Sequence, residues 1–170
     1  MPMPMPVRVE LSLQDMQVAA HIGVMRRIQG MSKGQNRFGY SEDAPWETDI
    51  VGCQAELVVC RRYNLHWSGA TPFGRDVGDI IDVRSIRSAD RRLILHPSDP
   101  DEVPFVLVLR SHKYQPLFDL CGWVFAKDGK RDYPLKTLKE NGEPAHYCDM
   151  LRPMSELDPW VEANRKPLKT

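Results

Sequence analysis

The sequence predicts a single domain over residues 1–170, of the α/β (α+β) class, with a central mixed β-sheet flanked by helices. Two helical patterns come first along the chain, several short β-rich runs follow, and the C-terminal part mixes turns with one short helix. Strands grouped after helices favour one central sheet. The chain has 170 residues, 42% hydrophobic and 27% charged, which is the size of one ordinary domain and supports a packed core.

The N-terminal segment predicts neither a helix nor a membrane anchor. Residues 1–6 alternate Met and Pro, and we expect them to form a flexible tail because proline cannot continue a helix. Residues 1–10 lack the long apolar stretch of a signal peptide. No apolar run approaches the roughly 18 residues needed to span a bilayer. We therefore expect a cytoplasmic protein with no membrane partner.

The first helix is expected to begin at Ser12 and to end near Gly30. Ser12 and Asp15 match a capping box of the S-x-x-D kind, which satisfies free backbone N–H groups at a helix start. An apolar stripe follows at helical spacing, formed by Leu13, Met16, Ala20 and Val24. Residues 31–43 are rich in Gly, Ser, Asn and charge, which is typical of a loop.

The second helix is expected over residues 46–63, with Pro45 in its first turn and Asn64 as its stop. Hydrophobic residues occur on most of its sides, which indicates a buried helix. Two of the four cysteines, Cys53 and Cys60, lie on it. Because the four form no C-x-x-C pair, we expect buried, reduced thiols rather than a zinc site.

Short β-rich runs follow the second helix and predict the sheet. They alternate with turn residues such as the Pro-Ser-Asp-Pro-Asp stretch. The expected strands lie within residues 79–86, 92–96, 104–109 and 121–126. From Lys127 onward we expect turns and a short helix around residues 155–163.

Glu56 is the first candidate for chemistry. Its neighbours one helical turn away are apolar, and a carboxylate on such an arc costs free energy unless a partner satisfies it. A metal ion or a buried arginine would both do so. Glu56 alone leaves these two alternatives open.

The segment from Arg75 to Ser85 supplies further charged candidates. On a strand, Asp82 and Arg84 would share one face. A three-residue loop at 77–79, with Gly78 permitting a tight turn, would place Asp76 opposite Ile80 and on the same face as Asp82. Two carboxylates could meet a divalent cation there. Hard oxygen ligands suit Mg²⁺ or Mn²⁺. Asp79 is a rival to Asp76, and a solvated hairpin with scattered surface charge is the alternative to a site.

The order of these features resembles the PD-(D/E)XK nuclease superfamily, in which a helix Glu precedes an Asp and a (D/E)-x-K strand. More narrowly, the chain is similar to short nuclease-like proteins of phage and metagenome origin. The resemblance covers roughly residues 45–153. Its segments are G-x-x-A-E-x-x-V at 52–59, D-V-G…V-R at 76–84, P-F-V-L-V at 104–108, and G-W-V followed by D-G-K within 122–130.

The resemblance implies a restriction-endonuclease-like core and a metal-dependent nuclease that hydrolyses phosphodiester bonds, with DNA as the expected substrate. It implies Glu56, Asp76 and Asp82 as catalytic ligands of Mg²⁺ or Mn²⁺. The usual lysine is Arg84 here, which cannot lose its proton near neutral pH and would instead stabilise the phosphate. The alternative is a catalytically inactive protein of this fold, a nucleic-acid-binding or protein-interaction module of phage biology in the host cytoplasm.

The charge of the chain limits how it could bind nucleic acid. It has 23 basic and 23 acidic residues, so any contact with DNA must come from a local basic patch. Lys127, Lys130 and Arg131 follow an expected strand and are the first candidates for contacting a phosphate backbone. His96, at a strand end, ranks below them. A homodimer is left open.

Overall fold

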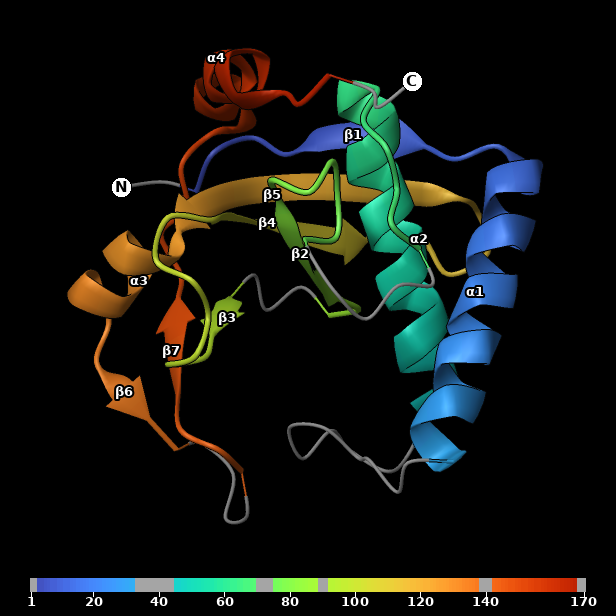
Figure 1. The fold of residues 1–170 in the computed structure, drawn as a ribbon, viewed down its shortest axis with the longest axis horizontal. Coiled ribbons are helices and arrows are strands. Elements are labelled where there is room, and N and C mark those ends of the chain that lie inside the picture. Colours follow the sequence, from blue (N-terminus) through green and yellow to red (C-terminus); the bar gives the residue numbers. More distant parts are fainter. Residues whose placement is uncertain (1–2, 33–44, 70–74, 89–91, 138–141, 168–170) are drawn as a thin grey trace.

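The computed structural model describes residues 3–32, 45–69, 75–88, 92–137 and 142–167. Within these ranges the chain forms four helices and seven strands (Figure 1). In chain order they are β1 (Val7–Glu10), α1 (Leu13–Ser32), α2 (Pro45–Tyr63), β2 (Asp82–Ile86), β3 (Leu93–Leu95), β4 (Pro104–Arg110), β5 (Leu117–Phe125), α3 (Ala126–Asp132), β6 (Leu135–Lys136), β7 (Ala145–Cys148) and α4 (Met154–Asn164).

The main sheet has the order β1-β5-β4-β2 and is mixed, because β2 runs parallel to β4 while the other neighbours are antiparallel. A mixed sheet with helices beside it confirms the predicted class. A second, antiparallel sheet has the order β3-β7-β6. The sequence prediction had placed β3 in one central sheet and had missed β1, β6, β7 and α3.

The two long helices are the best predicted elements. The Ser12 hydroxyl accepts a hydrogen bond from the Asp15 N–H at 3.0 Å, as expected of a helix cap, and α1 continues to Ser32 rather than ending near Gly30. Asn64 ends α2 in the left-handed region, with φ of 49°. Residues 33–43 of the expected loop lie outside the described residues.

The strand β4 separates two hydrophobic cores. Val106 and Val108 belong to the core that contains α2, whereas Phe105, Leu107 and Leu109 belong to the core shared with β3, β7 and α3. This alternation follows from the period of two along a strand. The sheet is therefore covered on both faces, with α1 lying beside α2 on the right of Figure 1.

The edge strand β2 inherits the same alternation through its pairing with β4. Asp82 pairs with Phe105 and Arg84 with Leu107, so both project from the face that carries these two side chains. Val83 packs into the core on the α2 side. The predicted shared face of Asp82 and Arg84 is confirmed.

Candidate carboxylate site

Glu56 is buried on α2, with 6% of its surface exposed, and an arginine satisfies it. The Arg26 guanidinium donates from Nη1 to Oε1 at 2.7 Å and from Nη2 to Oε2 at 2.8 Å. The Trp67 indole N–H also donates to Oε2, at 2.8 Å. Of the two alternatives that the sequence left open for Glu56, the structure has the arginine, and Arg26 is half-buried.

Arg26 is itself fixed in place. It projects from α1, and its Nε donates to the Gly69 carbonyl at 3.0 Å while Nη2 contacts the same oxygen. A bidentate pair with these added bonds is the geometry in which a buried carboxylate and guanidinium are both well satisfied. Arg26 therefore ties α1, α2 and the segment after Trp67 together at Glu56.

A tight turn brings Asp76 to Asp82. Val77 and Ile81 exchange backbone hydrogen bonds of 3.0 and 3.1 Å, and Gly78 at the tip has φ of 58°, which glycine adopts at little cost. The sequence reading had expected Val77 to Asp79 in the loop and Asp76 opposite Ile80. The loop is one residue further along, which sets Asp76 across from Asp82.

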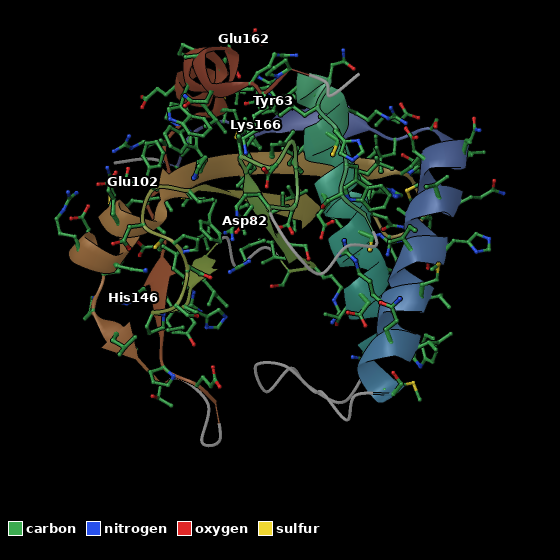
Figure 2. The ribbon with its side chains drawn as sticks, viewed as in Figure 1. Tyr63, Asp82, Glu102, His146, Glu162 and Lys166 are labelled. Atoms are coloured by element: carbon green, nitrogen blue, oxygen red, sulfur yellow. The ribbon has the colours of Figure 1, made fainter. Side chains whose placement is uncertain are left out.

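The Asp76 and Asp82 carboxylates each accept a backbone hydrogen bond from the opposite side of the turn. Asp82 Oδ1 accepts from the Asp76 N–H at 3.2 Å, and Asp76 Oδ2 accepts from the Val83 N–H at 2.9 Å. Asp82 Oδ2 also accepts from Arg75 Nη1 at 2.8 Å. Figure 2 shows Asp82 near the start of β2, between α2 and the side of the molecule that carries α3.

Burial and neighbouring charge act together on Asp76. Burial raises its pKa, Glu56 and then Asp82 raise it further, and the result is about 7. Burial also raises the pKa of Asp82, against the opposing effect of Arg75. Carboxylates from α2, the turn and β2 thus lie close enough to oppose one another's ionisation.

Asp79 is not part of this cluster. It is exposed and forms an ion pair with Lys166, which lowers the pKa of its carboxyl group. Of the two rival residues, Asp76 is the one beside Asp82.

Arg84 pairs with Asp99 rather than with any of the three carboxylates of the predicted site. Its Nη2 donates to both oxygens of Asp99 at 3.0 Å, its Nε donates to the Ile94 carbonyl at 3.2 Å, and its guanidinium lies 4.7 Å from the centre of the Phe105 ring. Arg84 still lowers the pKa of Asp76 and Asp82 electrostatically. It is a fixed cation next to the carboxylates.

Carboxylate oxygens are suitable ligands for Mg²⁺ or Mn²⁺. Of the three carboxylates in the cluster, however, only those of Asp76 and Asp82 are placed to bind such an ion. Among the described residues, no three His, Cys, Asp or Glu side chains are grouped as ready metal ligands. Glu56 holds Arg26 with both oxygens, whereas the Asp76 carboxylate receives only the Val83 N–H bond from described residues. Mg²⁺ commonly uses one or two carboxylates and keeps several waters, so Asp76 and Asp82 suffice.

The predicted nucleic-acid contacts lie elsewhere, on α3. Each of these cations is paired with a carboxylate: Lys127 with Glu102 at 2.9 Å, Lys130 with Asp101 at 2.9 Å and Arg131 with Asp132 at 2.7 Å. Their role in binding nucleic acid stays a prediction. Arg26 and Arg84 are paired with carboxylates too, and they line a pocket of about 300 Å³ beside the carboxylate site, together with His96.

The sequence prediction missed the side chains that pair with Asp82, Glu56 and Arg84. Arg75 precedes Asp76 directly, but only the turn shows that it reaches Asp82. Arg26 and Asp99 are 30 and 15 residues from the side chains they hold, at spacings with no recognisable motif.

Comparisons of the chain with models of protein families, with curated proteins and with solved structures find no match. None of the described helices combines the length and apolar character needed to cross a membrane.

Proposed function

We propose that the protein is a metal-dependent nuclease of the PD-(D/E)XK type that hydrolyses phosphodiester bonds, with DNA as its substrate in the cytoplasm. The observation that carries the proposal is the placement of Asp76. Its half-buried carboxyl group lies beside Glu56 and Asp82, and its pKa is raised to about 7. Such a placement is costly without a cation, and perturbed carboxyl groups of this kind mark functional sites.

Asp76 and Asp82 are the proposed ligands, with Arg75 leaving Asp82 Oδ2 when a cation binds. Bound there, Mg²⁺ or Mn²⁺ would lower the pKa of a water molecule and neutralise phosphate charge. Glu56 remains with Arg26 and positions that guanidinium. Arg84, permanently charged and held by Asp99, stabilises the scissile phosphate.

A cleavage assay tests this proposal. Labelled linear and circular DNA are incubated with the wild type in Mn²⁺, Mg²⁺ or EDTA, and the same is done with Asp82→Asn. We expect cleavage that needs a divalent cation, and a loss of about 10²–10³-fold in the variant, which is typical for removal of one charge-stabilising group.

Asp79→Asn is the matched control, since Asp79 lies on the same turn but outside the cluster. It should cleave like the wild type. Cleavage by Asp82→Asn at the wild-type rate, or by the wild type in EDTA, would refute the proposed site.

The second candidate function is a catalytically inactive relative that binds nucleic acid or protein. The bidentate pair between Arg26 and Glu56 favours it, because it occupies a carboxylate that the superfamily pattern gives to a metal. The neutral net charge favours it too. In this case neither Mn²⁺ nor Mg²⁺ produces cleavage, and the melting temperature does not rise with Mn²⁺ by mass action.

A further inference from the structure

The pocket beside the carboxylates contains more than the nuclease proposal uses. It lies where α2 faces β2, β3, β4 and β7, and its volume is about 300 Å³. Its lining combines three guanidinium groups, one phenol ring and two carboxylates, belonging to Arg26, Arg84, Arg92, Tyr147, Asp49 and Glu143.

Two of the arginines are held ready for an anion. Arg84 is fixed through Nε and Nη2, and its Nη1 has no hydrogen-bond acceptor among the described residues. Arg26 is fixed by Glu56 and the Gly69 carbonyl. A guanidinium whose rotamer is already set loses little entropy on binding, and its planar donors match phosphate oxygens.

The lining of the pocket presents guanidinium groups to a negative ligand. Three guanidiniums and two carboxylates line it, and one of these carboxylates, Asp49, is paired with Arg27 at 2.9 Å. Arg26 and Arg84 are also paired with Glu56 and Asp99, which do not line the pocket, and Arg84 Nη1, with no acceptor among the described residues, remains available to a ligand. Glu143, the other, is exposed. Phosphate monoesters carry about −1.5 to −2 charges at neutral pH, so they gain more from these cations than a diester does.

The remaining walls suit a flat, partly apolar group. Arg92 lies over the Tyr147 ring, 6.0 Å from its centre, which makes a platform of the kind on which bases stack. Ile94 and Leu107 are further lining residues. The volume is at the small end of small-molecule pockets, which span about 300–1,000 Å³. It admits one nucleotide unit but not a duplex.

We propose that this pocket binds a single nucleotide unit through a terminal phosphate. The phosphate lies against Arg84 and Arg26, and the base stacks on Tyr147 and Arg92. Two sources have this chemistry: a free nucleoside monophosphate, and the phosphorylated end of a DNA strand. The pocket shares Arg84 with the proposed nuclease site, but binding needs no metal and no cleavage, so it can be measured separately from nuclease activity.

Calorimetric titration in EDTA tests the pocket. The ligands are inorganic phosphate, nucleoside monophosphates, and a short oligonucleotide with and without a 5′ or 3′ phosphate. We expect nucleoside monophosphates to bind at least tenfold more tightly than inorganic phosphate. Tight binding of the phosphorylated oligonucleotide identifies a strand end as the source, and binding of the mononucleotide alone identifies the free nucleotide.

The variants are Arg92→Gln and Tyr147→Leu, both outside the proposed catalytic residues. Each should weaken mononucleotide binding at least tenfold, while Arg61→Gln, which removes an exposed arginine paired with Asp15, should not. Unchanged binding in both pocket variants would overturn the inference, as would a wild type that cleaves DNA yet binds no nucleotide. Nucleotide binding without any cleavage would uphold the pocket and refute the nuclease.

Discussion

At the scale of single residues, Asp76 couples the stability of the fold to pH. Its pKa is raised to about 7 in the folded protein, against about 3.9 for an ordinary aspartate. The folded state therefore binds the proton more tightly than the unfolded state. The stability that this contributes is fully present below about pH 4 and is lost as the pH rises through about 7.

Asp76→Asn should remove this pH dependence, because the amide keeps an acceptor for the Val83 N–H but cannot ionise. At pH 8 we expect the variant to be more stable than the wild type by about 0.5–3 kcal/mol, and at pH 4 to be nearly equal to it. Urea denaturation of both proteins at the two pH values measures the difference. If the stability difference between wild type and variant were the same at both pH values, the raised pKa of Asp76 would be contradicted.

The sequence allowed the charged residues of the candidate site to be identified one by one, but not the partners of all of them. An unsatisfied carboxylate on an apolar arc was visible at Glu56, and so was the need for a partner. That the partner is Arg26 depends on how α1 lies against α2, which no local pattern encodes. The convergence of Asp76 and Asp82 was predictable from the glycine turn, although its register was off by one residue.

At the scale of elements, the packing of α1 on α2 depends on one small residue. A Cβ on Gly23 would lie 2.6 Å from Ile50 Cα and 2.9 Å from Ile50 N. Backbone atoms cannot rotate away as a side chain can. Gly23 therefore lets α1 approach closely enough for Arg26, almost one turn further along, to reach Glu56.

Gly23→Ala should cost about 1–3 kcal/mol, in the usual range for overpacking. Gly52→Ala on α2 is the matched control, because a Cβ there meets no atom within 4 Å. It should instead stabilise the protein by about 0.5–1 kcal/mol, since alanine is the better helix former. Thermal melts of the two variants provide the test, and a similar effect of both would contradict the close crossing at Gly23.

Elements with strong local signals were the predictable ones. The Ser12 cap, Pro45 and Asn64 fix the ends of α1 and α2 to within a few residues. The strand β1 has only four residues and exists through pairing with β5, where Val7 lies opposite Leu120. Such long-range pairing leaves almost no trace in a short segment. The same holds for β6 and β7.

At the scale of the whole molecule, the net charge is zero, and many of the charged side chains form ion pairs with one another. The chain carries 23 basic and 23 acidic residues, and arginines from several elements pair with carboxylates of others. A net charge of zero gives the chain no overall electrostatic attraction to DNA, so binding depends on which cations contact phosphate. The candidates are the pocket arginines and the cations of α3.

The salt dependence of single-stranded DNA binding distinguishes these two surfaces. Each phosphate contact contributes about −0.7 to the slope of log K against log salt concentration for single strands. Contacts from Arg26, Arg84 and Arg92 alone give a slope of about −2, whereas the three cations of α3 in addition give about −4. Both surfaces contain cations that are paired with carboxylates. We expect the smaller slope, because Arg84 Nη1 has no acceptor among the described residues and is available to a phosphate. Fluorescence anisotropy in EDTA measures it, and Arg92→Gln should reduce its magnitude by about 0.7 while Lys130→Gln leaves it unchanged. A slope near −4 that falls in Lys130→Gln would move the DNA-binding surface to α3, as the sequence had predicted.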